Sequence, residues 1–419
     1  MLDRTSAPKS YLPDDLTLAS VQIKKLDNGI LFHQFIDDTN PVIKIDFIFP
    51  LGKAHGATAG LATLSAKMMM EGTHSYKATE LQETLDHYGA HIDISTEYDH
   101  TVVSLLCLKA HLFILLPLVK SILTEPLFES TDFEKVKSQM IQRVKVNNGK
   151  NGFLATKSLR ENLLDGTPYA FVADVASVSA ITLENVRQFF EKCFSIKPDI
   201  IIAGDFDKKV EDKVKSLFGI LRFEGDTVGI ISKPTPQYKP IEIKREGSVQ
   251  ASIRLGSLSI DRAHPDYFKL SVANEILGGY FGSRLMKNIR EDKGYTYGIS
   301  ASLISYKEIS YQIIGADVQL NKVDEAIAAC QHELKLMREV PVSEVELDTV
   351  KNYMLGKLAG HLDTVFAQAE NYKSKITHGI EYKRYFSDYV KEIRAVTPDT
   401  ISEISQQYFS ADYCIVKVV

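Results

Sequence analysis

An arginine and a tyrosine seven residues apart could bind a peptide carbonyl. Arg290 and Tyr297 lie in a glycine-rich stretch of the second half of the chain, NEILGGYFGSRLMKNIREDKGYTYGIS. A guanidinium and a phenol both donate hydrogen bonds, and together they can stabilise the oxyanion that develops when a carbonyl is attacked. A structural interpretation competes with this one: Arg290 pairs with a nearby acid, and Tyr297 packs on a strand. The two residues alone leave both interpretations open.

Other chemistries find less support in this sequence. Gly278, Gly279 and Gly282 are not followed by Gly-Lys-Ser/Thr, and they fall between two predicted helices rather than after a strand, which disfavours a phosphate-binding loop. The chain also has no G-x-S-x-G elbow and no serine or cysteine with an identifiable base. A stand-alone hydrolase with its own nucleophile is therefore not expected.

The first half holds a second stretch of interest, GLATLSAKMMMEGT at residues 60–73, whose apolar stripe has helical spacing. A helix with such a stripe is usually part of a core. Thr63, Ala66 and Lys67 occupy other positions of this helix. These three side chains are a weak metal ligand, a group that cannot move a proton and a cation, so this helix is not expected to hold a metal.

Composition is that of a globular protein of more than one domain. The chain has 419 residues, and 49 Lys and Arg are balanced by 54 Asp and Glu, so no basic surplus indicates a nucleic-acid partner. The four cysteines are scattered without a C-x-x-C pair, which favours reduced thiols. The N-terminal residues show no apolar h-region, and the most apolar run, 105–118, is too short to span a bilayer. We expect a soluble, cytoplasmic protein with no membrane partner.

Hydrophobic periodicity predicts the same order of elements twice: strand, helix, two strands and a helix pair. The fold class is therefore predicted as α+β, with two homologous α/β-layered domains. Each is expected to be a mostly antiparallel sheet packed with helices. The stretch 224–246 contains three prolines and little periodicity, and is predicted to be a linker between domains at 1–223 and 247–419. The principal segments predicted are a hairpin at 26–35, strands at 42–49, 200–203, 250–260, 295–304 and 310–318, two strands within 89–108, and helices at 60–70, 78–88, 109–124, 131–146, 153–164, 268–277, 283–291, 322–338 and 343–359.

Several short motifs, taken as a set, resemble the pitrilysin or insulinase-like zinc metallopeptidases, the inverzincins. The resemblance covers nearly the whole chain and implies a clamshell half built from two such domains. In the first half it rests on Gly60-Leu61-Ala62, Met68, Gly72-Thr73, Tyr88-Gly89-Ala90, Ile92, Thr96, Asp99, Thr101 and Gly204-Asp205-Phe206. In the second half it rests on Asn274, Leu277-Gly278-Gly279, Ser283-Arg284-Leu285, Arg290-Glu291, Gly294 and Tyr297.

The resemblance also implies where the family's zinc chemistry is missing. In that family a helix carries H-x-x-E-H, with two zinc ligands and a general-base Glu. The first His falls on Thr63, the Glu on Ala66 and the second His on Lys67, and the third ligand falls near Arg143. Two cations in this place would repel a divalent ion, so neither zinc binding nor metal-dependent water activation is expected.

The second half keeps its own part of the family's site, although the first half has lost the zinc ligands. The resemblance maps the family's Arg and Tyr that face the zinc site to Arg290 and Tyr297. The resemblance therefore implies a non-catalytic, substrate-positioning subunit of a heterodimeric zinc metallopeptidase that cleaves unfolded peptides. Zinc is expected in a homologous partner with an intact H-x-x-E-H, and no cofactor in this chain. The alternative is a peptidase-derived peptide-binding or scaffold protein with no hydrolytic role. Whether the chain also forms a homodimer stays open.

Overall fold

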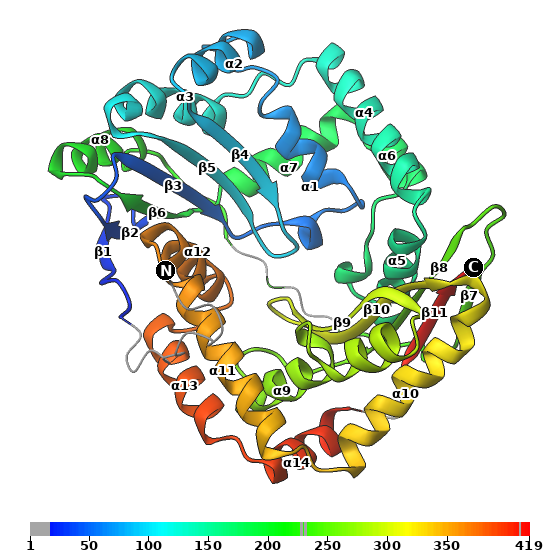
Figure 1. The fold of residues 1–419 in the computed structure, drawn as a ribbon. Coiled ribbons are helices and arrows are strands. Elements are labelled where there is room, and N and C mark those ends of the chain that lie inside the picture. Colours follow the sequence, from blue (N-terminus) through cyan, green and yellow to red (C-terminus); the bar gives the residue numbers. More distant parts are fainter. Residues whose placement is uncertain (1–16, 227–228, 230–232, 410–411) are drawn as a thin grey trace, which may run out of the picture.

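Two separate sheets carry the two halves of the chain (Figure 1). The computed structural model describes residues 17–226, 229, 233–409 and 412–419. Neighbouring strands are antiparallel except for the pairs β2–β6 and β7–β11. The first sheet has the order β1-β2-β6-β3-β5-β4, from strands β1 (Gln22–Lys25), β2 (Leu31–Ile36), β3 (Val42–Phe49), β4 (His91–Thr96), β5 (Thr101–Leu108) and β6 (Asp199–Gly204). The second has the order β7-β11-β8-β10-β9, from β7 (Ile241–Ile243), β8 (Gln250–Leu258), β9 (Thr296–Ser305), β10 (Ser310–Gln319) and β11 (Cys414–Val418).

Helices pack on both sheets, so the predicted α+β class is confirmed. The helices that follow first-half strands are α1 (Leu61–Met68), α2 (Ala78–His87), α3 (Leu112–Thr124), α4 (Ser130–Asn148), α5 (Asn151–Leu163), α6 (Val175–Ala180), α7 (Leu183–Phe194) and α8 (Lys208–Phe218). Those of the second half are α9 (Tyr267–Asn274), α10 (Val323–Glu339), α11 (Glu344–His361), α12 (Val365–Ile376), α13 (Tyr382–Ala395) and α14 (Pro398–Tyr408). Short 3₁₀ turns are η1 (Lys53–His55), η2 (Lys109–His111), η3 (Pro168–Ala170) and η6 (Leu320–Lys322), and two π-helical turns are η4 (Glu275–Gly279) and η5 (Met286–Asp292).

Each sheet buries one face in its own apolar core. On β3, alternate residues such as Ile45 and Phe47 face the first core, which includes Leu64 of α1 and Leu115 of α3. The second core combines residues of β8, β9 and β10 with helices α9, α10, α11 and α14. This alternation of buried and outward residues along antiparallel strands is what the period-two pattern of the sequence predicts.

One helix from each half packs on the sheet of the other half. Ala155 and Leu159 of α5 pack against Val416 of β11 in the second sheet. The chain permits this close approach at Gly256 of β8, where a Cβ would lie 2.8 Å from a methyl of Leu159. Figure 1 shows α5 lying against β8 and β11, and α12 lying against the other sheet at β6. The two halves are therefore interlocked rather than simply linked.

The reverse contact, between α12 and the first sheet, includes a buried group of charges. Asp46 of β3 is only 3% exposed, and its carboxylate accepts hydrogen bonds from Ser104 Oγ at 2.6 Å and from Lys373 Nζ of α12 at 2.8 Å. Lys44 lies 3.4 Å from the same carboxylate and also pairs with Glu370. A cluster of buried apolar residues from both halves also joins α12 to the first sheet. A charge cluster thus fixes α12 against β3.

The tips of two hairpins form a third contact between the halves. The β4–β5 turn contributes Tyr98 and Asp99, and the β9–β10 turn contributes Tyr306 and Lys307. The rings of Tyr98 and Tyr306 lie 4.9 Å apart, and the amide of Lys307 donates to Asp99 Oδ2 at 2.9 Å. Arg160 of α5 stacks on Tyr98, with its guanidinium carbon 4.3 Å from the ring centre.

The stability of this contact should fall in mild acid through His100. Burial lowers the pKa of His100 to about 4, although neighbouring Asp99 raises it. The unfolded value is about 6.5, so the unfolded chain binds more protons between these limits, and the free energy of unfolding falls as the pH drops from about 6.5 to 4. We expect a loss of about 2–3 kcal/mol, measured as the urea midpoint at each pH. His100→Gln should flatten this slope, whereas His87→Gln on α2 should leave it unchanged.

Part of the predicted linker is a strand. Ile241–Ile243 forms β7 at the edge of the second sheet, because its apolar–polar alternation suffices for a three-residue edge strand. Residues 227–228 and 230–232 of the predicted linker lie outside the described residues. The domain boundaries at 223 and 247 stay a prediction.

Candidate functional site

Arg290 presents an unengaged guanidinium. It lies in the π-helical turn η5, and its guanidinium carbon is 4.5 Å from the centre of the Phe281 ring. Among the residues that the structure describes, no carboxylate pairs with Arg290 and no hydrogen bond engages its side chain. The structural interpretation, in which an acid neutralises this arginine, therefore finds no support. Phe281 holds the flat face of the guanidinium and leaves its N–H groups available to a ligand.

Arg290 lies in the second of two π-helical turns, η4 and η5. In η5 the amide of Lys293 donates to the carbonyl of Asn288, five residues earlier, at 3.1 Å. Such turns are rare and often occur at functional sites, because they shift the side chains that follow around the helix. Phe281 belongs to the segment that joins η4 to η5. Sequence periodicity predicted an ordinary helix over 283–291, since an inserted residue in a single turn leaves that periodicity almost unchanged.

The glycine pair of this segment serves packing, as the absence of a phosphate motif suggested. A Cβ at Gly278 would lie 2.6 Å from the backbone N of Ala301 in β9, and one at Gly279 would collide with the carboxylate of Glu275. Close packing lets Asn274 Nδ2 donate to the Ala301 carbonyl at 3.1 Å. Burial raises the pKa of Glu275, and Lys357 at 3.9 Å opposes that shift. Gly278 therefore lets η4 pack against β9, and Gly279 leaves room for the Glu275 side chain.

The side chain of Tyr297 in β9 points into solvent. It is 89% exposed, although it lies only two residues before the buried Ile299 of β9. Among the described residues its phenol makes no hydrogen bond and no ring contact. The expectation that Tyr297 packs on a strand therefore fails, and the phenolic O–H is available to a molecule outside this chain.

A pocket is lined by Phe281, whose ring lies under the Arg290 guanidinium, and by Gly298, the residue that follows Tyr297. It has a volume of about 460 Å³ and lies between the two π turns, β9 and α11. Apolar and aromatic side chains line much of it, notably Tyr280, Phe281, Met286, Ile299 and Tyr353. The rings of Tyr280 and Tyr353 lie 5.2 Å apart. A pocket of this size and lining suits one large apolar side chain of a bound peptide.

The four positions that the resemblance assigns to the zinc motif, Thr63, Ala66, Lys67 and Arg143, lie on α1 and α4, which contact each other. The Thr63 hydroxyl lies 3.2 Å from the Thr96 hydroxyl of β4, and Ala66 is buried in the core. Lys67 and Arg143 are both exposed. Within the described ranges, no group of three His, Cys, Asp or Glu side chains could hold a metal ion. The residues present do not fit zinc, and no catalytic step through a metal can be derived from this chain.

We expect the purified chain to keep no stoichiometric zinc after dialysis, because its α1 offers one hydroxyl and one cation in place of two imidazoles. A matched variant, Thr63→His with Lys67→His, places two imidazoles four residues apart on one helix face and should gain zinc. Elemental analysis of both proteins after identical treatment measures the difference. One zinc ion per chain in the natural sequence would contradict this prediction.

The described part of the chain contains no helix with both the length and the apolar composition needed to cross a bilayer. The four cysteines are buried and free, as the sequence predicted. Burial raises the pKa of Cys107 and of Cys193 to about 12, so these thiols are not poised as nucleophiles.

Comparison with protein families gives two matches that together span most of the chain. Residues 42–170 match the family described as insulinase (peptidase family M16), and residues 180–354 match the M16 peptidase inactive domain. Among curated relatives, the "Uncharacterized zinc protease YmxG" of Bacillus subtilis is 22% identical over 85% of this chain and 87% of its own length. The "Non-peptidase homolog YmxG" of Helicobacter pylori is 26% identical over 79% of this chain and 81% of its own length.

Solved structures have the same fold. An M16 peptidase inactive domain from Pseudomonas fluorescens superposes with a TM-score of 0.84 at 23% identity, covering 95% of this chain and 98% of the other. A protease from Helicobacter pylori gives a TM-score of 0.85 at 16% identity, covering 96% and 100%.

Proposed function

The chain belongs to the M16 peptidase family, and from that premise we propose that it is the non-catalytic, substrate-positioning subunit of a heterodimeric zinc metallopeptidase. It is a catalytically inactive protein derived from a peptidase: Thr63, Ala66 and Lys67 stand where the family's zinc helix has its ligands and base. The proposed partner is a homologous subunit with an intact H-x-x-E-H, and the proposed substrates are unfolded peptides.

One observation carries the proposal: Arg290 and Tyr297 are both unengaged within the described part of their own chain, beside an open pocket. A guanidinium that, among the described residues, contacts the Phe281 ring alone and a phenol that is 89% exposed contribute little to the stability of the fold. Their donors are arranged for a ligand instead. Since the zinc positions of this chain are lost, a second chain must supply the chemistry that such donors would assist.

The geometry suggests what each group does to a bound peptide. The Arg290 N–H groups and the Tyr297 O–H donate hydrogen bonds to the oxygen of the scissile carbonyl, and these bonds strengthen as negative charge develops there. The pocket beside Phe281 and Met286 holds a neighbouring apolar side chain and so fixes the register of the peptide. The partner's zinc ion and glutamate supply the activated water.

The alternative is a peptide-binding or scaffold protein without any hydrolytic role. The loss of all the zinc-site residues favours it, and so does a relative named a non-peptidase homologue. The retained Arg290 and Tyr297, with their open pocket, favour the subunit. Both proposals place the protein in the cytoplasm, in keeping with four buried free thiols.

Affinity purification of the tagged full chain from the cells that express it tests the proposal. We expect a homologous chain with H-x-x-E-H to copurify at a ratio of about one to one, as heterodimeric assembly requires. An Arg290→Ala bait is the matched control and should capture the same partner, because that residue is assigned to substrate rather than to assembly. Recovery of the chain alone, or only as a homo-oligomer, would favour the peptide-binding alternative.

A further inference from the structure

Tyr297 leaves the sheet because the strand that carries it is bulged. Ala316 of β10 pairs with Ile299, and Val318 pairs with Thr296. One residue of β10, Asp317, therefore lies opposite two residues of β9, Tyr297 and Gly298. In a regular strand the side chain of Tyr297 would point to the same face as Ile299, which is only 4% exposed and faces the helices. The extra residue breaks that alternation and turns the phenol outward.

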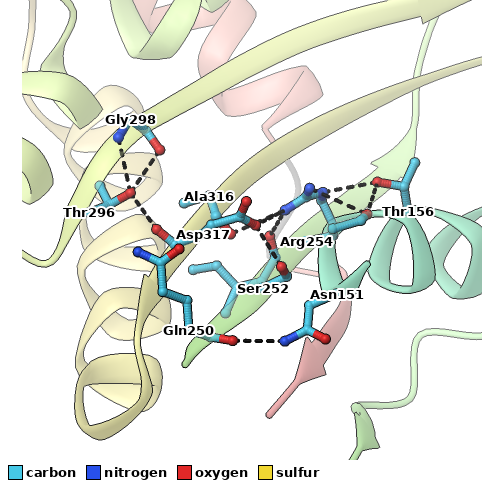
Figure 2. Close-up of polar contacts among 11 residues, drawn as sticks. Asn151, Thr156, Gln250, Ser252, Arg254, Thr296, Gly298, Ala316 and Asp317 are labelled. Carbon is cyan, nitrogen blue, oxygen red and sulfur yellow. Dashed lines mark hydrogen bonds and ion pairs between the residues drawn. The ribbon is translucent and has the colours of Figure 1, made fainter. Parts of the chain in front are cut away.

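A bulge leaves backbone groups without ladder partners, and the Thr296 side chain replaces them here (Figure 2). Its hydroxyl accepts a hydrogen bond from the Gly298 amide at 3.1 Å. The hydroxyl proton can be donated to the Asp317 carbonyl at 2.7 Å or to the Gly298 carbonyl at 2.8 Å. The Thr296 hydroxyl thus connects the residues on either side of Tyr297 to each other, through Gly298, and to β10, through the Asp317 carbonyl.

Asp317, the residue opposite the bulge, is fixed in turn. Its carboxylate accepts from Ser252 Oγ of β8 at 2.6 Å and lies 3.7 Å from Arg254 Nη1. Arg254 also donates to the Ala316 carbonyl at 3.1 Å and, through Nε, to Thr156 Oγ1 of α5 at 3.0 Å. Figure 2 shows these contacts running from α5 across β8 to the bulge. The base under Tyr297 is therefore tied to three elements of the fold.

We infer that Thr296 and Asp317 are positioning residues: they hold the bulge that presents the Tyr297 phenol to the substrate. This inference rests on the proposed function, since it assigns a purpose to the orientation of Tyr297. The bulge also explains why a tyrosine follows a threonine and precedes a glycine at this point, because each of the three does a separate task. Thr296 holds the bulge by hydrogen bonds to the backbone, Tyr297 donates its hydrogen bond to the substrate, and Gly298 leaves open space beside the bulge.

The first arm of the test measures the bulge in the full chain without any partner. In protein labelled with ¹⁵N-glycine, Thr296→Val should accelerate hydrogen exchange of the Gly298 amide by about tenfold or more, because that amide loses its acceptor. Thr296→Ser keeps the hydroxyl and should restore slow exchange. The matched control is Thr84→Val on α2, whose hydroxyl also bonds to a backbone carbonyl. Unchanged exchange of the Gly298 amide in Thr296→Val would contradict the claim that the Thr296 hydroxyl holds the bulge.

The second arm asks whether Thr296 acts through the Tyr297 phenol, in the complex with the H-x-x-E-H partner. We expect Thr296→Val to lower kcat by about tenfold with little change in KM, and Thr296→Ser to recover most of the loss. In a Tyr297→Phe background, Thr296→Val should cost almost nothing more, because the group that it positions is already gone. Additive losses would overturn the positioning role. Absence of cleavage by the unmodified complex would overturn the proposed function and the role of Tyr297 with it, whereas the exchange data would still decide the bulge.

Discussion

Arg290→Ala is expected to lower the kcat of the reconstituted complex by about 10²–10³-fold and to leave assembly intact, because a donor that meets the developing oxyanion contributes mainly to the transition state. Arg290 has no ion pair or hydrogen bond to lose among the described residues, so the fold should tolerate the change. Arg290→Lys should recover only part of the rate, since an ammonium keeps the charge but lacks the planar pair of donors. Steady-state kinetics at saturating peptide measure the effect.

The matched control for Arg290 lies on the same π turn. Lys287 is exposed on η5 and, among the described residues, does not share the Phe281 ring contact of Arg290, so Lys287→Ala removes a cation without removing a proposed ligand contact. We expect the kcat of this variant to stay within about twofold of the unmodified complex, as for surface substitutions that touch no substrate. Equal losses of kcat in Arg290→Ala and Lys287→Ala would show that the loss comes from the change in net charge and not from a specific contact of Arg290. An unchanged rate in Arg290→Ala would remove this residue from the site.

Asp46→Ala should be the most destabilising single change between the two halves. It leaves the buried Lys373 ammonium with the half-exposed Glu370 carboxylate as its partner, and it also takes a carboxylate from Lys44. Breaking one side of a buried pair costs about 3–5 kcal/mol, and because the contact with Glu370 remains we expect a loss of about 3 kcal/mol. Burial lowers the pKa of Lys373, but the carboxylates of Asp46 and Glu370 together more than offset it, so the pKa stays raised and the ammonium persists. The midpoint of urea unfolding should fall accordingly.

Two further variants separate the buried pair from surface charge. Asp93→Ala removes a carboxylate from the exposed side of β4 and should change stability by no more than about 0.5 kcal/mol. Asp46→Leu combined with Lys373→Met removes both charges and should recover most of the loss, because neither partner is then left unpaired. A stability loss in the double variant as large as that in Asp46→Ala would show that packing, not the charge pair, holds α12 on the first sheet.

The order of elements could be predicted from periodicity, but their packing could not. Alternating patterns gave β3, β5, β9 and β10 close to their observed bounds. An amphipathic pattern shows that a helix has an apolar face, but it does not show which sheet that face meets. The crossed packing of α5 and α12 on opposite sheets is therefore a finding of the structure. The prolines of segment 224–246 likewise masked the short strand β7.

At the site, residue identity was readable from the sequence and orientation was not. Arg290 and Tyr297 stood out through their spacing and their family resemblance. Arg290 lies in a π-helical turn, which differs from an α-helical turn by one hydrogen-bond step and is not revealed by periodicity. The outward turn of Tyr297 depends on a pairing shift opposite Asp317. The one local signal was the Thr-Tyr-Gly triplet, in which glycine after an aromatic residue in a strand can mark a bulge.

The assignment of a substrate-positioning subunit can be tested by cleavage of an unfolded reporter peptide, with the two subunits assayed separately and mixed. We expect no cleavage by this chain, weak cleavage by the H-x-x-E-H homologue alone, and a rate that rises with added chain until the ratio reaches one to one. The same titration with the Arg290→Ala chain should saturate at the same ratio but at a much lower rate. Full activity of the homologue alone, unaffected by this chain at any ratio, would contradict the assignment of a substrate-positioning subunit.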